Sequence, residues 1–140
     1  MLKLGSSKKR MTQHVDLDRK IHGLVVDDNP LIRRVHSAIL NRHGLETDSA
    51  ENGKVAVDLF LSGKKYDLVV MDMEMPVMDG IQATERLRAM GVKSMIIGVT
   101  ARGLDSEKEA FIRAGLDKCW EKPLNVELLN AALNELTMKV

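Results

Sequence analysis

The sequence predicts an α/β fold in which a parallel β-sheet is covered by helices on both faces. Two observations support this prediction. Short apolar runs of strand length alternate with segments in which apolar residues recur every three or four positions, the spacing of an amphipathic helix. The predicted strands are also apolar on both faces, which is typical of a parallel sheet buried between two helical layers.

Each predicted strand is short and is followed by a helix. Five such units between residues 20 and 140 fit a doubly wound, flavodoxin-like three-layer sandwich with a five-stranded parallel sheet. The predicted strands are Ile21–Val26, Leu45–Ser49, Leu68–Met71, Met95–Val99 and Lys118–Trp120.

The ends of the helices are predicted from capping residues and glycines. Asn29 can cap the first helix, with Pro30 at its first position, where a missing N–H costs nothing. Ser106 and Asn125 are predicted to cap the last two helices through their side-chain oxygens. The glycines expected to end the first four helices are Gly44, Gly63, Gly91 and Gly115.

Length and composition exclude several classes of protein. The 140 residues fit one domain, and the apolar runs fall far short of the roughly 20 residues that span a bilayer. The N-terminus lacks the long apolar block of a secretory signal. The single cysteine, Cys119, excludes an internal disulfide framework and a multi-cysteine zinc site. We therefore expect a reducing, cytoplasmic location and no membrane partner.

Charge is distributed unevenly along the chain. Residues 1–20 carry six Lys or Arg and two Asp, whereas residues 21–140 carry 15 Lys or Arg and 18 Asp or Glu. The mildly acidic larger part argues against nucleic acid as the main partner. We interpret residues 1–19 as a mobile basic tail and residues 20–140 as the folded domain. The basic run Lys8–Arg10 leaves a nuclear address open as an alternative to a solvated tail.

Polar side chains follow four of the predicted strands at the point where each strand ends. Asp27 and Asp28 follow the first strand and Asp72 the third. Thr100 follows the fourth strand and Lys122 the fifth. Because these ends of parallel strands lie at one edge of the sheet, where ligands bind, we expect the five side chains to meet in one cleft.

The chemistry of this set points to a cation and a phosphoryl group. Crowded carboxylates repel one another, so a cation is recruited or one carboxyl takes up a proton. Asp27 and Asp28 are the predicted ligands of Mg²⁺ or Mn²⁺, together with Asp72 and a backbone carbonyl at Glu74, because hard oxygen donors suit these ions.

Asp72 is the predicted nucleophile because it follows the central apolar strand alone. A carboxylate can accept a phosphoryl group and form an aspartyl-phosphate. The Lys122 ammonium and the Thr100 hydroxyl would then contact the charged phosphoryl oxygens.

Four motifs contain the predicted site residues: Val25–Asn29, Met71–Gly80, Val99–Ala101 and Glu121–Leu124. With these motifs, residues 21–136 resemble the receiver domain of two-component response regulators. This resemblance implies the strand order 2-1-3-4-5 and a cis peptide bond before Pro123. It also implies that Asp72 accepts a phosphoryl group from a phosphohistidine, with Asp27 and Asp28 organising Mg²⁺ and with Thr100 and Lys122 contacting the phosphoryl group.

The stretches Val92–Thr100 and Ala114–Leu124 are similar to plant type-C response regulators, which are free-standing receivers in cytokinin-related phosphorelays. This likeness implies a histidine-containing phosphotransfer protein, or a sensor histidine kinase, as the donor. We expect a monomer. The expected docking surface lies at the start of the first helix and in the loop after Lys122, and its residues are Pro30, Leu31, Arg34 and Leu124.

Three residues near the predicted site lead to further expectations. Most receivers have Tyr or Phe where this chain has Cys119, so an aromatic rotamer cannot report phosphorylation here. We interpret Cys119 as a small buried residue, with a redox sensor as the alternative. Glu74 and Arg102 each lie two residues after a site residue, and we expect them to pair and tune water access.

Two other functions stay open beside phosphoacceptance. The protein could be a Mg²⁺-dependent phosphatase that drains phosphohistidine from the phosphotransfer partner. It could also be an interaction module with a vestigial site, which the complete set of five site residues disfavours. Phosphatases of the haloacid dehalogenase type place their nucleophile in a DxD run after the first strand, which this chain lacks.

Overall fold

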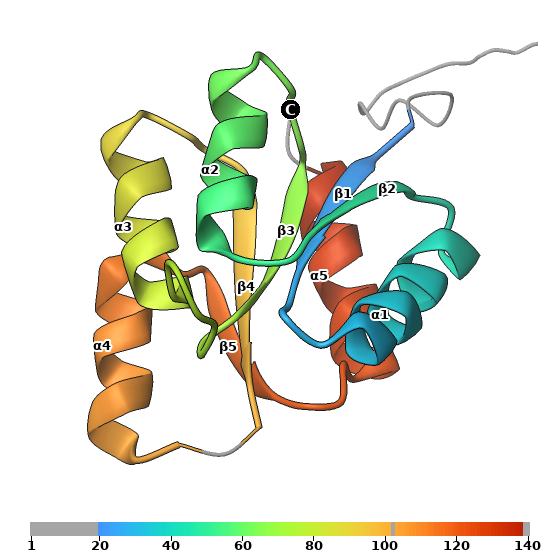
Figure 1. The fold of residues 1–140 in the computed structure, drawn as a ribbon. Coiled ribbons are helices and arrows are strands. Elements are labelled where there is room, and N and C mark those ends of the chain that lie inside the picture. The colour runs from blue at the N-terminus through green and yellow to red at the C-terminus, as the bar shows by residue number, and fades with distance from the viewer. Residues whose placement is uncertain (1–19, 102, 139–140) are drawn as a thin grey trace, which may run out of the picture. The chain divides into compact units, whose positions relative to one another are not determined.

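The computed structural model describes residues 20–101 and 103–138, so the predicted basic tail lies outside the described residues. Strands and helices alternate along this part of the chain, as predicted (Figure 1). The strands are β1 (His22–Val26), β2 (Glu46–Ala50), β3 (Leu68–Asp72), β4 (Met95–Thr100) and β5 (Lys118–Glu121). The helices are α1 (Pro30–Arg42), α2 (Gly53–Leu61), α3 (Gly80–Ala89), α4 (Asp105–Gly115) and α5 (Val126–Met138).

The five strands form one parallel sheet in the order β2-β1-β3-β4-β5, which confirms the doubly wound topology. Val26 of β1 is level with Met71 of β3, and Asp72 is level with Val99 of β4. From β1 the chain continues to β2 on one side of the sheet and later to β3 on the other, so the direction in which strands are added changes between β1 and β3. In open α/β sheets, ligands bind beyond the carboxyl ends of the strands at such a point. Asp27, directly after β1, and Asp72, at the end of β3, therefore lie where ligands bind in sheets of this kind.

Residues 20–125 form one compact unit that contains the sheet and the first four helices. Helix α1 packs against β1 and β2, whereas α2, α3 and α4 lie side by side on the other face of the sheet (Figure 1). Helix α5 belongs to the second unit. Among the described residues, no helix is long and apolar enough to cross a membrane.

The burial of each strand explains how clearly the sequence predicts it. Every residue of β3 and β4 is buried, which accounts for their unbroken apolar sequence. Strand β2 lies at the edge of the sheet and exposes most of its side chains, so its sequence is polar and its signal is weak. The core cluster around β1, β3 and β4 is built mainly from aliphatic and methionine side chains.

The caps of α1 and α3 hold the loops that leave β1 and β3. The Asn29 side chain accepts hydrogen bonds from the backbone N–H groups of Leu31 (2.9 Å) and Ile32 (3.3 Å), so the predicted cap of the first helix is confirmed. Asp79 accepts from the Gln82 backbone at 2.8 Å, and the Gln82 side chain accepts from the Asp79 backbone at 3.1 Å. This reciprocal capping box starts α3 at a defined position.

The predicted cap of the fourth helix is wrong. Helix α4 begins at Asp105, and Leu104 rather than Ser106 is its N-cap. The Glu107 carboxylate accepts a hydrogen bond from the Leu104 backbone N–H at 3.0 Å. The Glu107 side chain satisfies this backbone N–H group, and Ser106 lies inside the first turn of the helix.

Candidate functional site

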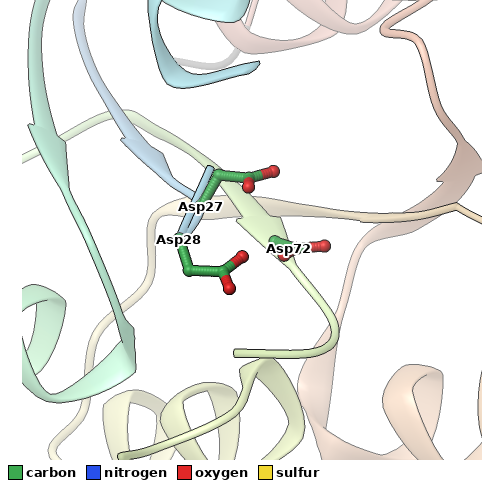
Figure 2. Close-up of side chains that lie close together, drawn as sticks. All are labelled: Asp27, Asp28 and Asp72. Carbon is green, nitrogen blue, oxygen red and sulfur yellow. The ribbon is translucent and has the colours of Figure 1, made fainter. Parts of the chain in front are cut away.

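Three carboxylates gather where β1 and β3 end (Figure 2). Asp27 and Asp28 directly follow β1, and Asp72 is the last residue of β3. Their ligand oxygens all lie within 4.8 Å of one another. Asp27 and Asp72 are buried and Asp28 is exposed, so the cluster is reached from solvent on the Asp28 side.

Lys122 brings a positive charge to this cluster from the end of β5. Its ammonium lies 2.8 Å from Asp27 Oδ2 and 3.0 Å from Asp72 Oδ1. The Lys122 backbone N–H donates to the Thr100 carbonyl at 2.8 Å, and the Lys122–Pro123 peptide bond is cis, the isomer that the resemblance implies. Burial opposes the charge on Lys122, but hydrogen bonds to the two carboxylates outweigh it and raise the pKa of the ammonium.

Asp27 is held rigidly although it is a buried charge, with 1% of its surface exposed. Its backbone N–H donates to the Ala50 carbonyl at 3.1 Å. Its Oδ1 accepts from the Asn29 backbone N–H at 2.9 Å, while its Oδ2 faces Lys122. The hydrogen bond to Oδ1 and the ion pair at Oδ2 offset the cost of burying this carboxylate, although Oδ2 accepts no well-aligned hydrogen bond.

The surroundings of Asp72 disfavour its negative charge. Burial is the main reason that its pKa is raised from 3.8 to about 6, and the neighbouring Asp27 and Asp28 carboxylates add to this effect. Lys122 acts in the opposite direction but does not cancel it. The site therefore holds more negative charge than one ammonium balances, which favours an additional cation.

Two glycines allow helices to press against the loop that follows Asp72. The Gly80 N–H donates to the Met73 carbonyl at 2.8 Å, and a Cβ on Gly80 would lie 2.1 Å from the Asp72 carbonyl oxygen. The Gly53 N–H donates to the Met78 carbonyl at 3.0 Å, and a Cβ there would lie 2.6 Å from the same carbonyl. The sequence reasoning missed this role, which a glycine at the first position of a helix could have signalled.

The same loop contains a strained residue. Val77 has φ of 72° and is 75% exposed. A β-branched residue rarely adopts this left-handed conformation, which costs roughly 1–3 kcal/mol. Strain of this kind is often found in loops beside functional groups.

The other predicted site residues lie as follows. Thr100 is the last residue of β4 and is 3% exposed, at the same edge of the sheet as Asp72. Glu74 is exposed in the turn after Asp72, and its expected partner Arg102 lies outside the described residues. Cys119 lies in β5, and burial raises the pKa of its thiol, which fits a packed residue better than a reactive thiolate.

The expected docking residues differ in their exposure. Pro30, Leu31 and Arg34 are exposed at the start of α1, with Leu31 59% exposed. Leu124, in the loop after Lys122, is only 4% exposed, so its side chain adds little to the exposed apolar surface. An apolar residue beside a proline in a loop gives no local sign of burial. Val35, 41% exposed and one turn after Leu31, extends the apolar patch instead.

Comparison with known proteins agrees with this arrangement. The response regulator receiver domain model matches residues 24–134, the range that contains all five site residues. The chain belongs to this family. As a receiver domain, it is 48% identical to two-component response regulator 24 of Arabidopsis thaliana over 123 residues, which is 88% of each chain.

Other receivers resemble it in sequence and in fold. Two-component response regulator ORR41 of Oryza sativa subsp. japonica is 44% identical over 118 residues, covering 82% of this chain and 93% of that protein. The Francisella response regulator 1452 receiver domain superposes with a TM-score of 0.74 at 28% identity, over 84% of this chain and 97% of that chain. A similar fit (TM-score 0.75, 25% identity, 84% and 89% coverage) is found with the Saccharomyces cerevisiae Ssk1 receiver domain, which was crystallised with the histidine phosphotransfer protein Ypd1.

Proposed function

We propose that this receiver accepts a phosphoryl group on Asp72 from the phosphohistidine of a phosphotransfer protein or a sensor histidine kinase. The main support is the set of charges around Asp72, where Lys122 lies 3.0 Å away and two further carboxylates lie within 4.8 Å. The Ssk1 receiver, which has a similar fold, forms a complex with a histidine phosphotransfer protein. The likeness to plant regulators supports a cytoplasmic relay of the cytokinin type.

Asp72 is suited to act as the nucleophile. With a pKa of about 6 it is ionised at neutral pH, and it is more basic than an ordinary aspartate. A carboxylate oxygen of Asp72 attacks the phosphorus atom, and a P–O bond forms as the P–N bond to the donor histidine breaks. The imidazole leaves with the bonding electron pair and takes up a proton. The Lys122 ammonium stabilises the negative charge on the phosphoryl oxygens.

The acidic cluster fits a divalent cation. Asp27 and Asp28, with Asp72 and the Glu74 backbone carbonyl, would hold Mg²⁺ or Mn²⁺, because carboxylate and carbonyl oxygens are the donors that these ions prefer. The raised pKa of Asp72 reflects burial together with the negative charge of the two neighbouring carboxylates. When bound, the cation would supply charge neutralisation for the transferred phosphoryl group.

The start of α1 is the proposed docking surface for the donor. Helix α1 begins three residues after Asp27, at the edge of the sheet where Asp72 lies. Leu31 and Val35 expose apolar side chains one turn apart on this helix, and Arg34 lies between them. A phosphohistidine on a helical partner packed against this patch would face the acidic cluster.

Phosphotransfer to an Asp72→Asn variant tests this proposal. Wild-type protein incubated with a radiolabelled phosphotransfer protein and Mg²⁺ should gain label, and the Asp72→Asn variant should gain none. Asp58→Asn is the matched control, because Asp58 is an exposed acid on α2 paired with Lys54 at 2.9 Å. Label on the Asp72→Asn variant at the wild-type level would contradict the proposal. Release of free phosphate without labelled receiver would favour the phosphatase alternative.

A further inference from the structure

We propose that Arg33 is a positioning residue that sets where Asp28 presents its carboxylate to the cation. The inference rests on the proposed metal site. Arg33 lies in the first turn of α1 and is half-buried. Its guanidinium Nη1 donates a hydrogen bond to the backbone carbonyl oxygen of Asp27 at 2.6 Å.

Arg33 completes the set of contacts that hold Asp27. The backbone N–H and both carboxylate oxygens of Asp27 already face Ala50, Asn29 and Lys122. The remaining polar group, the backbone carbonyl of Asp27, accepts the hydrogen bond from the Arg33 guanidinium. Through these hydrogen bonds, Asp27 connects the end of β1 with the loop that follows it and with helix α1.

The carbonyl that Arg33 binds belongs to the peptide unit that joins Asp27 to Asp28. Because a peptide unit is planar, holding this oxygen also sets the direction of the Asp28 N–H and the place of its Cα. Asp28 is the exposed member of the cluster, whereas Asp27 and Asp72 are held by burial. Arg33 therefore restrains the position of Asp28, the carboxylate of the three that is least restrained by burial.

A positioning role and a simple charge effect predict opposite results. The Arg33 guanidinium contacts the backbone of Asp27, one of the proposed cation ligands. By charge alone it would repel a divalent cation there, and its removal would tighten cation binding. If Arg33 orients Asp28, its removal would instead weaken binding. Groups that orient metal ligands typically change metal affinity by 10- to 100-fold when they are lost.

Mg²⁺ titration of Arg33 variants tests the inference. We expect the dissociation constant of Mg²⁺, measured by calorimetry on chelator-treated full-length protein, to rise about tenfold in Arg33→Met and in Arg33→Gln. Arg42→Met is the matched control, since it removes the same charge from an exposed arginine in the last turn of α1, and its Mg²⁺ affinity should be unchanged or slightly tighter. Thermal melting without Mg²⁺ ensures that each titration is made on folded protein.

Each other outcome has a definite meaning. Unchanged or tighter Mg²⁺ binding in either folded Arg33 variant would overturn the positioning role. Equal weakening in Arg42→Met would also overturn it, because the effect would then not depend on the contact with the Asp27 carbonyl. Failure of the wild-type protein to bind Mg²⁺ would contradict the proposed metal site, and this inference with it.

Discussion

An Asp72→Asn variant is expected to be about 3 kcal/mol more stable than the wild type at neutral pH in the absence of divalent cations. The pKa of Asp72 is raised from 3.8 to about 6, chiefly by burial, so the ionised carboxylate destabilises the folded state. A shift of about two pKa units corresponds to about 3 kcal/mol. Asparagine has nearly the same shape and carries no charge, so it removes this cost.

The gain in stability should depend on pH in a defined direction. Folded Asp72 binds its proton more tightly than unfolded Asp72, so folding takes up a proton between the two pKa values. The wild type should gain stability relative to the variant as pH falls from above 6 to below about 4, where the difference disappears. Urea unfolding of both proteins across this range measures the difference. A gain that stays constant with pH would contradict burial of a charged Asp72.

A Gly80→Ala variant is expected to lose about 3 kcal/mol of stability, at the upper end for overpacking. The new Cβ would lie 2.1 Å from the Asp72 carbonyl oxygen and 3.0 Å from Met73 Cα. Both neighbours are backbone atoms, so the conflict can be relieved only by moving α3 or the end of β3. Urea denaturation measures the loss.

Gly63→Ala is the control for this prediction. Gly63 has φ of 98°, and a Cβ added there would have no atom within 4 Å, so alanine meets strain but no collision. We expect a loss of about 1 kcal/mol, as for a left-handed alanine. Equal losses in the two variants would show that close packing against Asp72 is not what requires Gly80.

The sheet and the acidic site could be predicted because they follow from local rules. The unbroken apolar sequences of β3 and β4 correspond to strands buried on both faces. Parallel strands end at the same edge, so the residues that follow β1, β3 and β5 were expected to meet, and Asp27, Asp72 and Lys122 do so. Sequence order alone was sufficient for this part of the site.

The features that sequence reasoning missed depend on contacts between separate segments. Leu124 is buried, and the need for glycine at Gly53 and Gly80 arises from helices that press on a distant loop. The left-handed backbone of Val77 contradicts the preference of its own side chain. The hydrogen bond from Arg33 to the Asp27 carbonyl joins a helix to a strand end through the backbone, which a pattern of side-chain types does not reveal.

Chemical identification of the phosphorylated residue tests the central claim most directly. After transfer from a phosphotransfer protein, borohydride reduces an aspartyl-phosphate to homoserine, and mass spectrometry of the digested protein locates the new residue. We predict homoserine at position 72 and unmodified Asp27 and Asp28. Homoserine at either of those two positions, or phosphate carried by a histidine of this chain, would contradict the account.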